Sequence, residues 1–187
     1  MADADRILVL GIGNILWADE GFGVRAVEEF HRLYRVPERV SVVDGGTQGL
    51  YLVQFLEAAD RVLVFDAIDY GLAPGTLKVV RDAEVPRFTG AKKMSLHQTG
   101  FQEVISAADL LGRCPRHLAL VGVQACDLED WGGPLTAPVR EKIAPALELG
   151  CAILREWGVE AELRETPLPP AQGLLINDLD HSSYEMR

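Results

Sequence analysis

The feature that most constrains this chain is the alternation of short apolar runs with longer segments of helical periodicity. Four runs are rich in Val, Ile and Leu, as strands are when both faces of their sheet are covered; they are residues 7–10, 40–43, 62–65 and 118–121. Apolar residues recur at helical spacing in the ranges 21–34, 49–58, 98–111 and 134–157. The pattern predicts an α/β fold, with a twisted, mostly parallel sheet and helices on both faces.

One further strand is expected at an edge of this sheet. Residues 77–80 follow a Pro-Gly turn, and no helical segment separates them from the preceding strand. A strand that returns without a crossover helix runs antiparallel, so the predicted sheet is mixed.

The length of 187 residues suits one hydrophobic core. We assign residues 1–164 to a single α/β domain. Residues 165–187 contain clustered prolines and no clear periodicity, which predicts an extended tail that is either mobile or laid over the surface.

Charge and composition exclude several classes of protein. The net charge of −10 opposes binding to nucleic acid, and no apolar run approaches the roughly 18 residues of a membrane helix. The acidic first residues are unlike a basic signal peptide, so we expect a cytoplasmic protein. Cys114, Cys126 and Cys151 are widely spaced and odd in number, which predicts buried thiols rather than disulfides or a zinc ribbon.

Polar residues gather where the predicted strands end, which is where open α/β sheets bind their ligands. They are Asn14, Asp19 and Glu20 after the first strand, Asp44-Gly-Gly-Thr47 after the second, Asp66 and Asp69 after the third, and Gln124 and Asp127 after the last. The first group lies in LVLGIGNILWADEGFG, which begins like a dinucleotide-binding turn. However, Leu16 stands at the third glycine position, where it would obstruct close approach of the helix, so the G-x-G is weak evidence for NAD.

Three of these side chains have the chemistry of a metal site. Glu20, Asp66 and His97, the last just before a predicted helix, would supply two carboxylates and an imidazole to a borderline divalent ion such as Zn or Ni, with open coordination positions. Simpler interpretations remain open at this point. Glu20 could favour a helix N-terminus, Asp66 could cap a loop, and His97 could be an ordinary surface histidine.

Five segments together resemble the hydrogenase maturation endopeptidases, which process the large subunit of NiFe hydrogenases. They are GIGNILWADEGFG, DGGTQGLYLVQFL, VFDAIDYGLAPGTL, SLHQTGFQEVI and LVGVQACDLEDWGGPLT, in order between residues 8 and 151. The resemblance implies the fold of that family, a single cut near the C-terminus of a nickel-loaded precursor, and Glu20, Asp66 and His97 as the metal ligands.

The metal implied by the resemblance is nickel carried by the substrate, although Zn or Cd could occupy the same site. Because a metal can polarise the scissile carbonyl or activate water, no Ser or Cys nucleophile is required. Asp44 and Asp69 are candidates for the catalytic base. Two alternatives are a non-enzymatic protein that delivers metal to hydrogenase and a nucleotide-binding α/β module, and the crowd of acids opposes bound phosphates in the latter.

Overall fold

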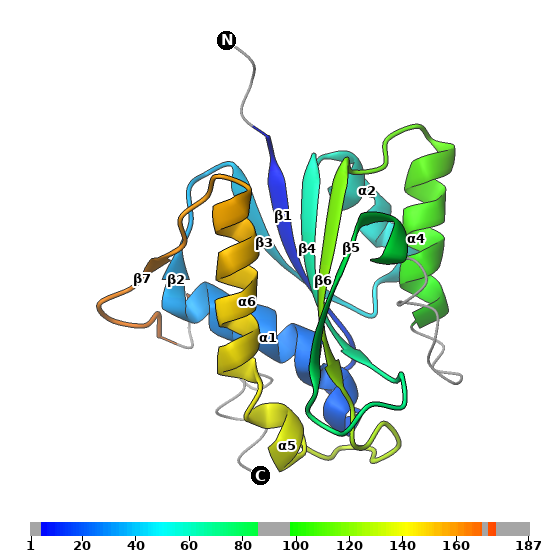
Figure 1. The fold of residues 1–187 in the computed structure, drawn as a ribbon, viewed down its shortest axis with the longest axis vertical. Coiled ribbons are helices and arrows are strands. Elements are labelled where there is room, and N and C mark those ends of the chain that lie inside the picture. The colour runs from blue at the N-terminus through cyan, green and yellow to red at the C-terminus, as the bar shows by residue number, and fades with distance from the viewer. Residues whose placement is uncertain (1–4, 86–97, 170–171, 175–187) are drawn as a thin grey trace.

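The computed structural model describes residues 5–85, 98–169 and 172–174, and its centre is a five-stranded sheet (Figure 1). The strand order is β3-β1-β4-β6-β5, and all neighbours are parallel except β5, which runs antiparallel to β6 at the edge. The strands are β1 (Ile7–Ile12), β3 (Val40–Gly46), β4 (Arg61–Ile68), β5 (Leu77–Arg81) and β6 (His117–Gln124). The predicted α/β class and the antiparallel edge strand are confirmed.

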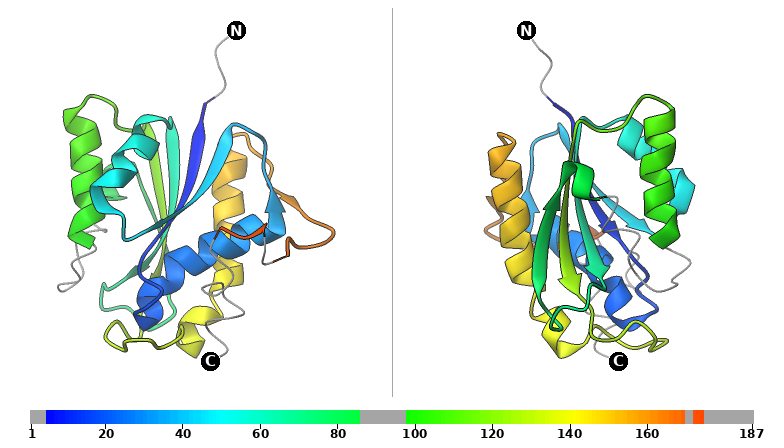
Figure 2. Two further views of the ribbon diagram at one scale, coloured as in Figure 1. Left: turned by 180° about the vertical axis from the view of Figure 1, so that it is seen from behind. Right: turned by 45° about the vertical axis from the view of Figure 1, so that its right-hand side comes forward.

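Helices cover both faces of the sheet (Figure 2). α1 (Phe22–Leu33) and α6 (Ile143–Glu156) cover one face, and α2 (Val53–Glu57) and α4 (Gln98–Leu110) cover the other. The shorter elements are η1 (Ala18–Gly21), η2 (Gly49–Leu52), η3 (Asp82–Glu84), α5 (Ala137–Arg140), and the antiparallel pair β2 (Tyr34–Arg35) and β7 (Glu162–Leu163).

The core has two parts, one on each face of the sheet. Successive strand residues point to opposite faces, so alternate positions enter different clusters. In β4, Leu63 and Phe65 pack with α1 and α6, whereas Val62 and Val64 pack with α2 and α4. Near-continuous apolar sequence in the parallel strands follows directly from this double burial. Among the described residues, no helix is both long and apolar enough to cross a membrane.

The segment predicted as one helix over 134–157 is two helices. α5 ends at Arg140 and α6 begins at Ile143, with a turn at residues 141–142. Pro138 lies in the first turn of α5 and Pro145 in the first turn of α6. A proline is tolerated in a first turn because the backbone N–H groups there have no partner within the helix. Two prolines seven residues apart therefore favour two helix starts.

The described part of the predicted tail lies against α1. The Leu168 N–H donates to the Arg32 carbonyl at 3.0 Å, and His31 Nε2 donates to the Gln172 carbonyl at 3.2 Å. Residues 170–171 and 175–187 lie outside the described residues, and the boundary between residues 164 and 165 stays a prediction.

The prediction of three buried thiols is wrong. Cys126 is exposed, and Cys114 and Cys151 are only partly buried. Cys126 lies in the loop after β6, where its backbone N–H is turned inward to a buried carboxylate. Burial raises the pKa of both Cys114 and Cys151, which keeps these two thiols protonated and less nucleophilic near neutral pH.

Candidate functional site

The site is built where the first turn of α1 meets the ends of β1 and β4. A Cβ atom on Gly23 would lie 2.2 Å from the carbonyl oxygens of Ile12 and Phe65, and one on Gly11 would lie 2.3 Å from the Gly23 carbonyl oxygen. Only glycine fits at these contacts. The helix therefore packs closely on the sheet, contrary to the expectation based on Leu16. Gly23 provides this close approach because η1 is inserted between the strand and the helix.

This packing brings η1, which carries Glu20, against β4, which carries Asp66. Both side chains belong to buried residues, with exposed fractions of 5% for Glu20 and 3% for Asp66. Asp66 lies inside β4 and not after it, since that strand continues to Ile68. Successive residues of a strand point to opposite faces, so Asp66 points away from the face of Phe65 and to the same face as Val64 and Ile68. That face is the one covered by α2 and α4.

Two carboxylates buried at one edge create a strongly negative site. The charge of Asp66 reaches Tyr70, whose pKa is raised first by burial and second by that charge. Buried carboxylates are retained in proteins when they bind a partner of opposite charge, such as a metal ion. The two carboxylates are therefore suited to binding a cation.

The third predicted ligand, His97, lies outside the described residues. The described chain resumes at Gln98, where α4 begins, and α4 covers the face to which Asp66 points. Within residues 5–85, 98–169 and 172–174, no group of three His, Cys, Asp or Glu side chains could hold a metal. The structure thus brings two of the three predicted ligands to adjacent elements, and the role of His97 stays a prediction.

Asp44 occupies the other face of the sheet. It pairs in register with Gly11, so β1 lies between it and the end of β4, at a separation of about two strand spacings, or roughly 10 Å. Its Oδ1 accepts the Gly46 N–H at 2.9 Å, as expected for a turn residue before a Gly-Gly bend. Burial raises the pKa of Asp44, and the Gly46 N–H and the charge of Arg25 partly oppose this.

The raised pKa of Asp44 gives the stability a defined pH dependence. The folded state binds the proton more tightly than the unfolded state, so the stabilisation is complete below the unfolded pKa and is lost as pH rises through the folded one. The amide of an Asp44→Asn variant cannot titrate. We therefore expect the unfolding free energy of the wild type to fall relative to that variant as the pH rises above the ordinary Asp pKa of about 3.9. Urea unfolding at a series of pH values measures the difference, with Asp109→Asn, at an exposed position on α4, as the control. A wild-type free energy that rises with pH relative to the Asp44→Asn variant would contradict the assignment.

Asp69, the second candidate base, follows β4 directly. Its Oδ1 accepts a hydrogen bond from Gln124 Nε2 at 3.2 Å, while Gln124 Oε1 accepts the backbone N–H groups of Tyr70 and Leu72. Gln124, the last residue of β6, thus fixes the conformation of the turn that follows β4. A catalytic role for Asp44 or Asp69 stays a prediction.

Asp19 is a structural centre of the site to which the sequence alone assigned no role. It is fully buried, and its carboxylate accepts hydrogen bonds from the backbone N–H groups of Cys126, Asp127 and Thr136 and from the Thr136 hydroxyl, at 2.7–2.9 Å. It joins η1 to the loop between β6 and α5. No local pattern reveals this, because its partners are 107–117 residues away.

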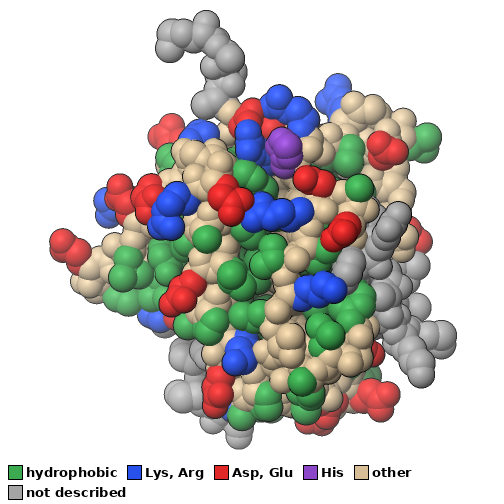
Figure 3. Space-filling model, in the orientation of Figure 1, with side chains coloured by type: hydrophobic (Ala, Val, Ile, Leu, Met, Phe, Trp, Pro, Cys, Tyr) green, Lys and Arg blue, Asp and Glu red, His purple; other side chains and the backbone are tan. Residues whose placement is uncertain are grey.

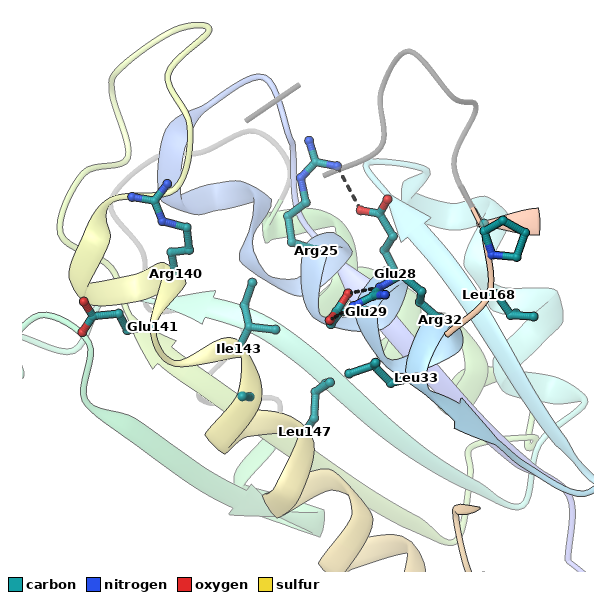
Figure 4. A pocket seen from close by; sticks show the side chains of 13 residues that line it. Arg25, Glu28, Glu29, Arg32, Leu33, Arg140, Glu141, Ile143, Leu147 and Leu168 are labelled. Carbon is teal, nitrogen blue, oxygen red and sulfur yellow. Dashed lines mark hydrogen bonds and ion pairs between the residues drawn. The ribbon is translucent and has the colours of Figure 1, made fainter. Parts of the chain in front are cut away.

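A separate cavity of about 620 Å³ lies between α1, α5, α6 and the chain near residues 168–173 (Figure 4). The charged side chains of its α1 wall pair with one another: Arg25 with Glu28 at 3.0 Å and Arg32 with Glu29 at 2.7 Å. Glu20 and Asp66 do not line it. We therefore attribute the cavity to helix packing and not to the candidate site.

Comparison with known proteins decides the family. The family model described as hydrogenase maturation protease matches residues 24–153, more than half of the chain. This chain belongs to that family. The maturation protease fold is also seen in the solved hydrogenase maturating endopeptidase HybD from Escherichia coli, which is 46% identical with a TM-score of 0.80 over 85% of this chain and 98% of that one.

Curated relatives agree with this assignment to the maturation proteases. The hydrogenase expression/formation protein HupD of Bradyrhizobium diazoefficiens is 74% identical over 183 residues, covering 98% of this chain and 95% of the relative. The hydrogenase 2 maturation protease of Escherichia coli is 48% identical over 162 residues, covering 86% and 97%. The resemblance found in the sequence is confirmed, and the protein is a protease of hydrogenase maturation.

Proposed function

We propose that this protease removes a short C-terminal extension from the nickel-loaded precursor of a NiFe hydrogenase large subunit. The observation that carries the proposal is the placement of Glu20 on η1 and of Asp66 on β4, two buried carboxylates on elements in contact. The substrate and its nickel are inferred from the chemistry of these residues together with the family. No nucleophilic Ser or Cys is needed for such a cut.

The nickel is treated as part of the substrate. Two carboxylates, with His97 as a third donor, would share an ion already bound to precursor thiolates, because borderline divalent ions accept mixed O, N and S ligands. In the absence of the precursor, the same ligands would also accept Zn or Cd. However, a ligand set without a thiolate would bind a free ion only weakly. Recognition then depends on whether the precursor carries its metal, because the site binds the nickel-loaded precursor more tightly than the metal-free one.

The residues of this chain would act by orientation and proton transfer. Glu20 and Asp66 would fix the precursor through its metal, which places the peptide bond after the metal-binding segment at the carboxyl edge of the sheet. Asp69 is the better candidate for the base, since it follows the same strand as Asp66, whereas Asp44 faces α1. We place this step in the cytoplasm.

The decisive experiment is the intact mass of the hydrogenase large subunit in host cells that lack this gene. We expect a C-terminal extension that persists in the deletion and disappears when the wild-type gene is restored. Restoration with His97→Ala should leave the extension in place, and a fully active His97→Ala protein would contradict the ligand set. A subunit that is fully processed in the deletion strain would instead favour metal delivery by this protein.

A further inference from the structure

A pair of tryptophans, Trp131 exposed and Trp17 half-buried, stands beside the candidate site. The rings of Trp17 and Trp131 meet edge to face, with centroids 4.9 Å apart and an interplanar angle of 82°. Trp131 is 63% exposed, although burial of an indole ring contributes more free energy of stabilisation than burial of most side chains. Tryptophan is among the residues most enriched at binding hot spots. The pair is therefore a candidate contact surface.

The pair is held in a fixed position. Trp17 and Trp131 form a β-bridge, and the Gly132 N–H donates to the Leu16 carbonyl at 2.8 Å. The same loop is anchored by the four hydrogen bonds to buried Asp19. A partner that binds rings already held in place loses little conformational entropy in ordering them.

The loop that presents Trp131 is acidic. Residues 125–136 contain Asp127, Glu129 and Asp130 and no Lys or Arg. The Asp127 carboxylate accepts the backbone N–H groups of Glu129 and Asp130, and the side chains of Glu129 and Asp130 are exposed. Within the described part of the chain, none of the three forms an ion pair. Figure 3 shows hydrophobic side chains between acidic ones at this lower end of the molecule.

The surface is continuous with the candidate site. The Trp17 carbonyl accepts the backbone N–H of Glu20 at 2.8 Å, so Trp17 and the proposed nickel-contacting Glu20 belong to one turn, and the Trp131 ring contacts that turn through Trp17. A polypeptide that brings its metal to this turn therefore has the two rings close by in the structure. The neighbouring carboxylates favour a cationic side chain, and an aromatic face attracts Arg or Lys in addition.

We propose that Trp17, Trp131, Glu129 and Asp130, here called the aromatic platform, form the docking surface for the precursor. The platform takes a precursor segment that carries Arg or Lys among apolar residues. This inference rests on the proposed function and deepens it, because it assigns substrate affinity to residues outside the metal-contacting set.

The first test is Trp131→Ala, assayed with the purified nickel-loaded precursor as the probe. We expect KM to rise about tenfold or more while kcat changes less than about threefold, because the platform binds the precursor away from the scissile bond. Trp131→Phe should restore part of the loss. Leu110→Ala is the matched control, since Leu110 is 89% exposed on α4 and lies outside the platform.

The second test addresses charge. The double variant Glu129→Gln/Asp130→Asn should raise KM and weaken its dependence on salt, since screening then has fewer charges to act on. Glu162→Gln/Glu165→Gln removes two exposed carboxylates elsewhere and should match the wild type. Circular dichroism and thermal unfolding establish that each variant is folded.

The outcomes separate this inference from the proposed function. A wild-type enzyme that processes the precursor, with folded Trp131→Ala and charge variants of unchanged KM, would overturn the platform and leave the proposed function intact. Failure of the wild type to process the nickel-loaded precursor would overturn both.

Discussion

Asp66→Asn is expected to lower the rate of precursor processing at least about 100-fold while leaving the protein folded. The amide keeps the size of the side chain but removes the charge that would contact nickel. Because Asn has nearly the same volume as Asp, the packing of β4 against η1 should be kept. Thermal unfolding shows whether the variant is folded, so a loss of rate can be separated from a loss of structure.

The measurement is the initial rate at which intact mass spectrometry detects the shortened large subunit. Asp109→Asn is the matched control, because Asp109 lies exposed on α4. An Asp66→Asn protein that is stable and processes the precursor at the wild-type rate would remove Asp66 from the proposed ligand set. A protein that has lost both stability and activity would show that Asp66 supports the fold instead.

Gly23→Ala is expected to reduce the unfolding free energy by about 3 kcal/mol or more, which can prevent folding altogether. The new methyl group would lie 2.2 Å from two backbone carbonyl oxygens, those of Ile12 and Phe65, and neither strand can move without disturbing the central sheet. Any relaxation would push η1 away from β4, so activity should fall even in the fraction that folds.

Gly112→Ala is the control for Gly23→Ala. Gly112 lies in the turn after α4 with a φ of +68°, and an added Cβ meets no atom within 4 Å. Its replacement costs only the left-handed backbone conformation, about 1–2 kcal/mol. Urea unfolding of both variants compares the two effects, and a loss for Gly23→Ala no larger than that for Gly112→Ala would refute the close-packing argument.

Strand and helix layout could be predicted because hydrophobic periodicity is a local property. Both faces of β1, β4 and β6 are buried, so these strands appear in the sequence as near-continuous apolar runs. The turn before β5 indicated an edge strand. The position of β5 beside β6, and not beside β4, depended on the crossover through α4, which no local pattern specifies. The sequence also predicted ends for two strands that come too early in the chain. Asp44 and Asp66 are polar and were placed after the strands, yet they lie within β3 and β4.

The sequence by itself determined that acidic residues gather near the carboxyl ends of the strands, since parallel strands bring those ends together at one edge of the sheet. Only the tertiary structure decided which face of the sheet each of those residues occupies and which of them support the fold. Strand parity turned Asp66 towards α4 and Asp44 towards α1, and Asp19 became the anchor of a loop more than 100 residues away. The reason is physical: hydrogen bonds and close contacts between distant segments leave no periodicity in the sequence, and they form only once the core has fixed where those segments meet.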